Sequence, residues 1–347
     1  MNFMMSKKIL ITGASGFVGS FLVEEALNQG FDVWAGMRAS SSRKFLPDSR
    51  IRFAELEMSD KQVLASQLDQ FKREFGGWDY IIHCAGVTKC IDRSEFMRVN
   101  YLNTRYFVEA LQESGMIPER FVYISSLSVL GPIREQDYTD IVDTDIPQPN
   151  TAYGRSKVEA EKYLLALAPD FPVVILRPTG IYGPRERDYF MMAQSIMKHI
   201  DFAAGFKRQD ITFVYVKDVV QAAFLALSAQ QVIGKCYFLS DGEVYNSRAF
   251  CDLIQKELGV KWVLHFVSPI WLLKTLSFLA EALSQITGKP STLNLDKYRI
   301  MKQRNWRCDI TPARKDLGYR PAYSLERGVR EAMNWYKEAG WIKTKKA

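Results

Sequence analysis

The sequence predicts an α/β fold, with a doubly wound parallel sheet and a smaller, mostly helical C-terminal lobe. Short apolar runs alternate with segments of helical periodicity through the first two thirds of the 347-residue chain. Buried strands joined by helix-length connections imply right-handed βαβ units and a sheet covered by helices on both faces. A glycine-rich turn follows the first apolar run and opens the first helical segment, which is typical of sheets that bind a ligand at their carboxyl end.

Each predicted strand of the sheet is a short apolar run that stands between helical segments. In chain order these runs are residues 9–11, 33–37, 51–56, 80–84, 121–124 and 173–176. The helix after the first run has an apolar stripe that begins at Val18, and Gly30 marks its stop. Ser59 and Gln62 resemble a capping box at the start of the next helix.

The alternation of apolar runs and helical segments becomes less regular after Gly183. Three later apolar runs are expected to be strands, at 213–216, 236–239 and about 262–266. The chain is expected to end in a helix from about Ser324. We therefore assign residues 1–183 to the sheet domain, with segments from about 211–240 returning to it. Residues 184–347 then form mainly a second, discontinuous lobe.

Residues 267–286 are apolar enough for a membrane helix to be considered. Pro269, Lys274 and Glu281 interrupt the run and argue against a bilayer span. We expect a buried helix or one wall of a substrate pocket. The alternative is that this helix lets the protein rest on a membrane, because its face is apolar and the chain has a formal charge of +7.

The composition argues against several classes of protein. Lys and Arg residues are scattered, the dense run at 343–346 is typical of a solvated tail, and no zinc-finger or RNA-binding signature occurs. Nucleic acid is therefore not expected as a partner. Five cysteines without a CxxC motif indicate reduced thiols in a cytoplasmic protein. The three histidines lie far apart, which predicts structural roles and no metal site. The N-terminus leads almost directly into a strand, without a secretory signal.

The glycine-rich turn spans residues 13–19, with the sequence GASGFVG. In such a turn one glycine allows the tight bend, one lets the backbone approach a pyrophosphate, and one lets helix and strand pack closely. The helix N-terminus then offers unpaired N–H groups and a positive dipole end to the phosphates. Although the spacing is GxxGxxG rather than GxGxxG, the turn predicts a Rossmann-type NAD(P)-binding domain over residues 1–183. The predicted binding residues of the turn are Gly13, Ser15, Gly16, Phe17, Val18 and Gly19.

The end of the second strand predicts the type of cofactor. Sites for NAD usually place an acid there for the ribose 2′-hydroxyl, whereas this strand ends at Arg38 with no acid. Unless Arg38 is merely solvated, its guanidinium would bind a 2′-phosphate, so we expect NADP(H) to be preferred, with NAD(H) as the alternative. Other strand ends are expected to supply Glu57 to the adenine amino group, Met58 to its ring, Cys84, Ala85 and Gly86 beside the cofactor, and Pro178 near the nicotinamide.

Tyr153 and Lys157 lie four residues apart, so they share one face of a helix. A nearby ammonium lowers the pKa of a phenol toward the range of general acid–base catalysis, and an oxidised nicotinamide would add to this effect. We expect Lys157 also to hold the nicotinamide ribose. Ser126, after the fifth strand, is expected to hold the substrate oxygen while Tyr153 transfers the proton, with Ser125 in support. The alternative is that both serines only satisfy local backbone groups.

Together these motifs resemble the extended short-chain dehydrogenase/reductase superfamily, also known as the epimerase/dehydratase family. The matching segments are TGASGFVG at 12–19, the strand end at 125–126, YxxxK at 153–157 and RPTGIYGP at 177–184. The resemblance covers nearly the whole chain. It implies a nicotinamide cofactor, a catalytic group of Ser126, Tyr153 and Lys157, and a homodimer joined by helices.

Several positions depart from the sugar-modifying members of that superfamily. Gly180 and Ile211 stand where nucleotide-sugar epimerases usually have an asparagine and an arginine, and residues 127–128 lack the Asp-Glu pair of the dehydratases. An acidic loop at 135–145 would repel a diphosphate if it lined the pocket, although it also suits a loop that faces water. The RPTG segment and the apolar helix look more like the 3β-hydroxysteroid dehydrogenase and dihydroflavonol reductase branch.

We therefore expect an NAD(P)-dependent oxidoreductase that interconverts a secondary alcohol and a ketone on a hydrophobic or uncharged small molecule. The alternative is a nucleotide-sugar epimerase or related sugar-modifying enzyme. Its diphosphate contacts would come from Arg185, Arg187, Lys207, Arg208 or Arg248. A third hypothesis, a non-catalytic NADP-binding regulator, leaves the acid–base group without a purpose.

Overall fold

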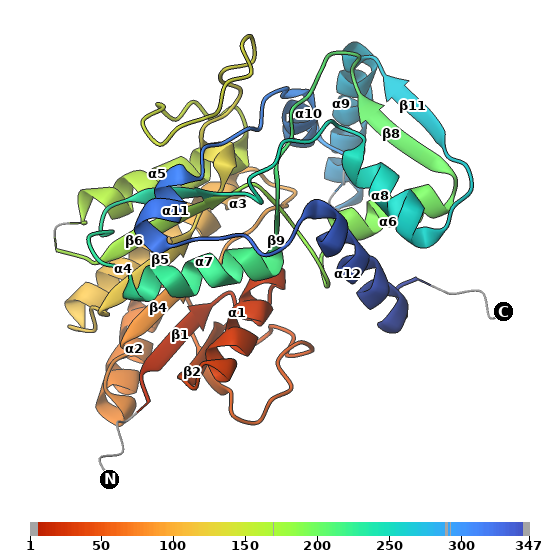
Figure 1. Ribbon diagram of the computed structural model, residues 1–347. Helices are drawn as coiled ribbons and strands as arrows, with labels where there is room; N and C mark the ends of the chain where they lie inside the picture. The colour runs from red at the N-terminus through yellow and green to blue at the C-terminus, as the bar shows by residue number, and fades with distance from the viewer. Residues whose placement is uncertain (1–5, 169, 289–290, 292, 343–347) are drawn as a thin grey trace.

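The computed structural model describes residues 6–168, 170–288, 291 and 293–342, so the basic run at 343–346 lies outside the described residues. At its centre is a seven-stranded sheet in the order β10-β6-β5-β4-β1-β2-β3, with all neighbouring strands parallel (Figure 1). The strands are β1 Lys8–Thr12, β2 Asp32–Met37, β3 Arg52–Glu55, β4 Tyr80–His83, β5 Arg120–Ile124, β6 Val173–Pro178 and β10 Cys236–Leu239. Each coincides with a predicted apolar run, and the predicted doubly wound α/β sheet is confirmed.

Helices cover both faces of this sheet (Figure 1). One face carries α2 Lys61–Phe75, α4 Asn103–Glu113 and α5 Ala152–Ala166, and the other carries α1 Phe17–Asn28, α7 Val216–Ser228 and α11 Thr311–Leu317. The short helix α3 Ser94–Phe96 and the π-helix η1 Met97–Leu102 lead into α4, and the 3₁₀-helix η2 Leu127–Val129 follows β5. The predicted capping box at Ser59 is wrong. The N-cap of α2 is Asp60, whose carboxylate accepts hydrogen bonds from the backbone N–H groups of Gln62 and Val63.

The C-terminal lobe consists of helices and two small parallel sheets (Figure 1). One sheet pairs β7 Gly180–Tyr182 with β9 Phe213–Tyr215, and the other pairs β8 Ile200–Ala204 with β11 Leu264–Ser268. The helices of the lobe are α6 Asp188–Met197, α8 Ala249–Leu258, α9 Ile270–Thr287, α10 Leu295–Lys302 and α12 Leu325–Glu338. Within the range 211–240, α7 and β10 return to the central sheet. The strand predicted at 213–216 pairs with β7 instead, because β5 and β10 already occupy both sides of β6.

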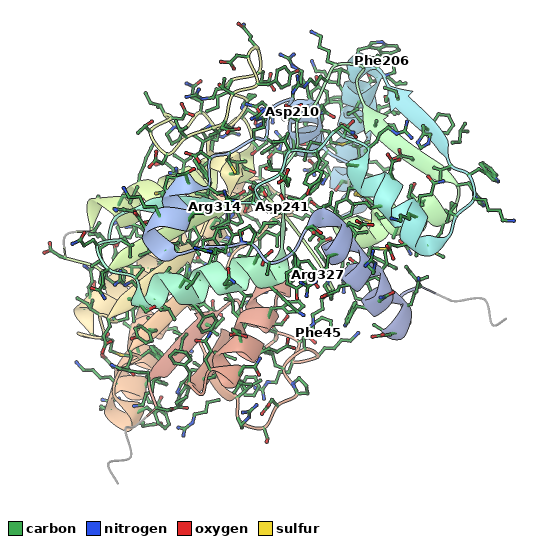
Figure 2. The ribbon with its side chains drawn as sticks, in the orientation of Figure 1. Phe45, Phe206, Asp210, Asp241, Arg314 and Arg327 are labelled. Atoms are coloured by element: carbon green, nitrogen blue, oxygen red, sulfur yellow. The ribbon has the colours of Figure 1, made fainter. Side chains whose placement is uncertain are left out.

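The two parts of the chain touch at the loop that follows β2. In this loop the ring of Phe45 lies 6.3 Å from that of Trp335 in α12. The guanidinium of Arg185 stacks on Phe45 and on Phe21 of α1, at 4.9 and 4.3 Å from the ring centres. In Figure 2, Phe45 therefore lies close to α1 and α12, whereas Phe206 marks the far end of the C-terminal lobe.

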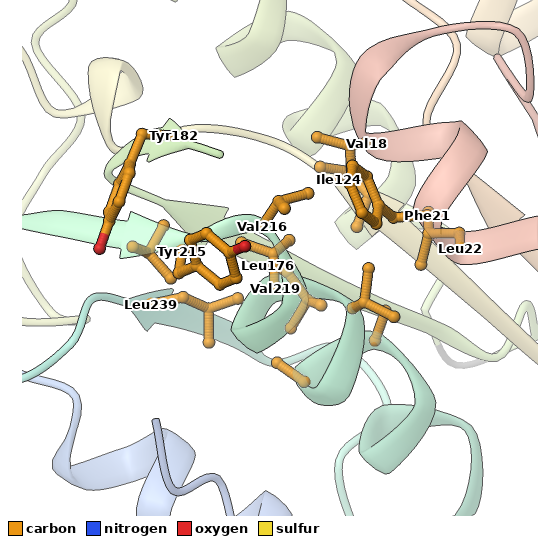
Figure 3. Packing of buried hydrophobic residues seen from close by; sticks show 14 of the residues in the cluster. Val18, Phe21, Leu22, Ile124, Leu176, Tyr182, Tyr215, Val216, Val219 and Leu239 are labelled. Atoms are coloured by element: carbon orange, nitrogen blue, oxygen red, sulfur yellow. The ribbon is translucent and has the colours of Figure 1, made fainter. Parts of the chain in front are cut away.

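The core lies on both faces of the central sheet, because its strands are buried on both sides. In β1, Ile9 and Ile11 pack with α1 and α7, while Leu10 between them packs with α2 and α4, as the two-residue period of a strand requires. All three side chains are fully buried, and each stabilises the fold by about 1.5–3 kcal/mol. Figure 3 shows side chains of α1, α7 and several strands in the hydrophobic cluster to which Ile9 and Ile11 belong.

The apolar segment at 267–286 does not form the expected buried helix. Helix α9 buries only Leu273, Ser277 and Ser284, while residues such as Trp271 are exposed. Glu281, Ser284 and Gln285 of α9 line a small cavity beside Phe96. Among the helices that the structure describes, none is long and apolar enough to cross a membrane.

Candidate active site

The predicted cofactor residues flank the point at which the order of the sheet reverses. From β1 the sheet continues through β2 and β3 on one side, and from β4 through β5 and β6 on the other. Sheets of this kind bind ligands in the crevice between the carboxyl ends of those two central strands. Residues 13–19 follow β1 and residues 84–86 follow β4, so both predicted segments meet at this crevice.

Close backbone contacts explain the glycines of the turn. Gly13 has a φ of +67°, and a Cβ on it would lie 2.8 Å from the backbone of Cys84 and Ala85. A Cβ on Gly19 would lie only 2.1 Å from the carbonyl oxygen of Gly13. Gly16 is exposed and begins α1 without a side-chain cap, which leaves the N–H groups of this helix end to a phosphate. This geometry fits the pyrophosphate of a dinucleotide.

The remaining predicted cofactor residues lie in the glycine-rich turn or directly after β2 and β3. In the turn, Ser15 and Phe17 are half-buried and Val18 is buried in the core. Arg38 is exposed directly after β2. Glu57 is half-buried, and its carboxylate accepts hydrogen bonds from the hydroxyl and backbone N–H of Ser59. Met58 packs at the edge of the core. Arg38 is therefore open to a ligand, whereas the carboxylate of Glu57 is partly engaged in a local turn.

Tyr153 and Ser126 come together at the ends of α5 and β5. Tyr153 lies in the first turn of α5, whose N-cap Thr151 accepts a hydrogen bond from the Gly154 N–H at 3.0 Å. Burial raises the pKa of Tyr153 to about 12, against the opposing effect of a hydrogen bond with the Ser126 hydroxyl. The expected lowering of this pKa is therefore wrong for the polypeptide described here, because burial is the stronger influence.

Lys157 lies one turn further along α5 and is buried against the end of β5. Its ammonium donates hydrogen bonds to the backbone oxygen of Ile124 at 2.8 Å and to the hydroxyl of Tyr123 at 3.2 Å. Burial lowers the pKa of Lys157 to about 8. A Cβ on Gly86 would lie 3.6 Å from the Lys157 Nζ atom. The ammonium thus lies beside the segment after β4 where the cofactor is expected.

Cys84 links the glycine-rich turn to these side chains. The backbone N–H of Gly19 hydrogen-bonds with its sulfur, and the charge of Lys157 also acts on it. Burial raises the pKa of the Cys84 thiol to about 11, so the sulfur remains protonated and unreactive at neutral pH. Its contacts show that the first turn of α1 and the second turn of α5 meet at the end of β4.

The Ser125 side chain points into a buried hydrogen-bond network and not toward Tyr153. Its hydroxyl donates to the carboxylate of Glu161, which also accepts two hydrogen bonds from Arg177 at 2.7 and 3.1 Å. All three side chains are buried. This geometry favours the alternative in which the Ser125 hydroxyl is structural. Pro178 follows Arg177 as the last residue of β6 and is also buried.

Asn100, which the sequence analysis did not single out, fixes the surroundings of Lys157. It is buried in η1, donates to the Ser156 hydroxyl and the Val87 carbonyl, and accepts from the Val87 N–H at 2.7 Å. These bonds hold the segment after β4 against α5. A π-helical turn often marks a functional site. An asparagine inside an amphipathic helical pattern, where this residue is disfavoured, is the signal that could have indicated it.

His83 has a structural role, as predicted. Its ring nitrogens hydrogen-bond with the hydroxyls of Thr12 at 2.8 Å and Thr104 at 3.0 Å. The Thr12 hydroxyl also accepts from the Ala85 N–H at 3.3 Å. Burial, together with the charge of Lys157, lowers the pKa of His83 to about 3. A neutral imidazole therefore joins β1, β4 and α4 directly beneath the crevice.

The C-terminal lobe also reaches the start of α5, next to Tyr153. Asp296 of α10 accepts a hydrogen bond from the Ala152 N–H, at the start of α5, at 2.7 Å. The ring of Phe96 lies edge-on to that of Tyr153, with 6.0 Å between ring centres. Phe96 and Asp296 line one small cavity together with Glu281 of α9. The C-terminal lobe thus contacts the residue before Tyr153, and it lines a cavity together with Phe96, whose ring contacts that of Tyr153.

Known proteins of one family match this chain. The model of the NAD dependent epimerase/dehydratase family matches residues 9–246. A 3 beta-hydroxysteroid dehydrogenase/Delta 5-->4-isomerase of Mycobacterium tuberculosis is 27% identical, over 95% of this chain and 90% of its own length. A UDP-glucose 4-epimerase of Vibrio cholerae is 26% identical, over 96% of this chain and 97% of its own length. Relatives of similar identity therefore include both a dehydrogenase and a sugar epimerase.

The solved structures include the Bordetella bronchiseptica enzyme WbmG in complex with NAD. It superimposes with a TM-score of 0.76 at 20% identity, over 98% of this chain and 97% of that one. At such low identity the likeness establishes the fold alone.

Proposed function

The chain belongs to the NAD-dependent epimerase/dehydratase family of the extended short-chain dehydrogenase/reductase superfamily, and from this premise we propose that it is an NAD(P)-dependent oxidoreductase. It interconverts a secondary alcohol and a ketone on a hydrophobic or uncharged small molecule. One observation carries the proposal: the Ser126 hydroxyl bonds to the Tyr153 phenol at the end of β5, while Lys157, one turn along the same helix, lies beside Gly86 after β4.

In this proposal Tyr153 transfers the proton of the reacting oxygen. A phenol with a pKa of about 12 holds its proton at neutral pH, so it can donate to the carbonyl oxygen when a ketone is reduced. The Ser126 hydroxyl, which bonds to the same phenol, orients that oxygen. A bound nicotinamide would supply or accept the hydride.

In this proposal Lys157 binds a ribose hydroxyl of the cofactor and adjusts the pKa of Tyr153. An ammonium has three donors, of which Ile124 and Tyr123 engage two, so one is left for a ribose hydroxyl of the cofactor. When an alcohol is oxidised the phenol must first lose its proton. In that step the positive charges of Lys157 and of an oxidised nicotinamide would favour the deprotonated phenol.

We infer further that NADP(H) is the preferred cofactor. The family is NAD-dependent, but the exposed Arg38 stands at the strand end where an acid would select NAD. A guanidinium at this point favours a 2′-phosphate through charge-assisted hydrogen bonds.

Two observations favour an uncharged substrate over a nucleotide sugar. The hydroxyl of Tyr189 lies 2.6 Å from the position that a Cβ on Gly180 would take, so an epimerase-type asparagine would require Tyr189 to shift. Three of the five basic residues considered for a diphosphate are already in ion pairs. These pairs are Arg185–Glu24, Arg208–Asp210 and Arg248–Asp252.

The acidic loop at 135–145 does not distinguish an uncharged substrate from a nucleotide sugar. Most of its carboxylates are paired: Asp145 with Arg134, Asp140 with Arg307 and Glu135 with Arg304. Such pairs offset the repulsion of a diphosphate that the sequence alone led us to expect.

The purified protein can be tested with NADPH or NADH against uncharged ketones, steroids and UDP-, GDP- and dTDP-sugars. We expect NADPH consumption with an uncharged ketone and no thermal stabilisation by any nucleotide sugar, since a ligand that binds the native state raises its stability. Stabilisation by a nucleotide sugar, with epimer conversion at constant nicotinamide absorbance, would establish the alternative instead.

A further inference from the structure

Exposed large apolar side chains are concentrated at the end of the C-terminal lobe. In the described part of the chain, fourteen of the twenty such side chains lie in residues 197–208 and 261–288. These two segments, here termed the apolar end, contain β8, β11 and α9, which gather away from the central sheet (Figure 1), with Phe206 near the tip (Figure 2). Exposed apolar side chains that form a contiguous patch often mark an interaction surface.

Helix α9 presents its apolar face outward. Trp271, Phe278 and Ile286 are 70%, 59% and 83% exposed and recur at spacings of seven and eight residues, which places them on one side of a helix. Leu276, Leu279 and Leu283 widen this exposed face. The buried side of the helix is narrow and includes two serines. A helix that packs on the core of a soluble protein instead buries its apolar face and exposes its polar side.

The two strands of the apolar end continue the pattern. Ile200 pairs with Leu264 and Phe202 with Phe266, so these four exposed side chains share one face of the β8–β11 sheet. The other face holds the pair of Asp201 and His265, 2.9 Å apart. The strands lead into α9, and Gly205 after β8 lies against Ile270 at the start of that helix. The β8–β11 sheet and α9 are therefore in contact at the start of the helix.

The free charges of the apolar end are positive. Lys198, Lys207, Lys261 and Lys274 are exposed and form no ion pair within the described residues. The two acids of these segments are both engaged, Asp201 with His265 and Glu281 with Arg93. Exposed Trp262 and Trp271 add the aromatic side chains that prefer the membrane–water interface. Apolar, aromatic and basic side chains therefore occur together.

We propose that the apolar end docks on the surface of a bilayer that contains anionic lipids. The outward side chains of α9 and the β8–β11 sheet enter the boundary between headgroups and acyl chains, and the four lysines contact lipid phosphates. A second copy of the chain is a poorer occupant, because a twofold contact through α9 would bring like charges such as Lys274 together. The other edge of α9 borders the cavity beside Phe96, so docking would hold this cavity near the membrane.

The test is sedimentation of the full chain with phosphatidylcholine vesicles, with and without phosphatidylserine. We expect the mixed vesicles to carry down the protein at low salt, with a partition coefficient roughly tenfold or more above that of phosphatidylcholine alone. The double variant Trp271→Ser/Phe278→Ser should lose this binding. The control Ile146→Ser removes an apolar side chain that is 75% exposed outside the apolar end, and it should bind as the wild type does.

Three results would overturn the proposal. The wild type could remain in the supernatant with both vesicles, the double variant could still bind, or the Ile146→Ser control could lose binding equally. The proposal would also be overturned if the wild type formed a dimer and the double variant did not, because a second copy would then cover the surface. Thermal unfolding of each variant shows that it is folded. Because the assay uses no substrate, its failure leaves the proposed oxidoreductase untouched.

Discussion

The carboxylate of Asp296 accepts a hydrogen bond from the backbone N–H of Ala152, although 144 residues separate them in the chain. The bond joins α10 of the C-terminal lobe to the first turn of α5, one residue before Tyr153. Thr151 caps the same helix end through Gly154. The position of the proposed proton donor thus depends on a residue of the other lobe.

Asp296→Ala should reduce turnover by roughly tenfold, because small displacements of a catalytic group are costly, while cofactor affinity stays unchanged. The matched control is Asp309→Ala, which removes a carboxylate that accepts from the Thr311 N–H at the start of α11. Each variant should lose about 1 kcal/mol of stability. Equal turnover in the two variants would remove Asp296 from the account. Steady-state kinetics and cofactor titration provide the comparison.

Arg38→Ala should lower kcat/KM with NADP(H) by roughly 10- to 100-fold, the effect of losing a charged hydrogen bond, and leave kcat/KM with NAD(H) nearly unchanged. Arg43→Ala is the control, because Arg43 lies in the same loop after β2 but its guanidinium stacks on Phe53 of β3 at 4.0 Å. A wild type that prefers NAD(H) would show that Arg38 is only solvated.

Gly19→Ala should destabilise the fold by about 1–3 kcal/mol, since a methyl group has no room against Gly13. It should also abolish cofactor binding, because the turn must shift. Gly77→Ala places a methyl group where no atom lies within 4 Å and should be tolerated. Thermal unfolding with and without NADPH measures both effects. Equal melting temperatures for the two variants would mean that α1 packs less closely than described.

The His83 imidazole should make stability depend on pH. Its pKa is about 3 in the folded chain and 6.5 for the free side chain, so acid protonates the unfolded state first and favours unfolding. Between about pH 7.5 and about pH 5.5 this costs about 1.4 kcal/mol. The free energy of unfolding of His83→Gln should therefore fall less over that range, by this amount. Parallel pH profiles for wild type and variant would contradict a neutral, buried His83.

The sheet, its glycine-rich turn and the spacing of Tyr153 and Lys157 could be predicted because each is a local pattern. A buried parallel strand is a continuous apolar run, and residues four apart share a helix face. The sign of the Tyr153 pKa shift could not be predicted, since it depends on how deeply the phenol is buried.

Contacts between segments that lie far apart in the chain could not be predicted from the sequence. Nothing local indicates that Asp296 meets Ala152, or that β8 pairs with β11. Periodicity located α9 but not its environment, because an apolar stripe looks the same whether it faces a core or a membrane. The expectation of a buried helix failed for that reason, and the exposure of Trp271 and Phe278 became visible only in three dimensions.

The most direct test of the proposed mechanism is single-turnover hydride transfer by Tyr153→Phe, with Tyr163→Phe on the same helix as the control. A positioned acid contributes about 10²–10⁴-fold, so the rate in Tyr153→Phe should fall by that factor. NADPH should bind almost unchanged, and Tyr163→Phe should react at the wild-type rate. Wild-type hydride transfer in Tyr153→Phe would show that another group moves the proton.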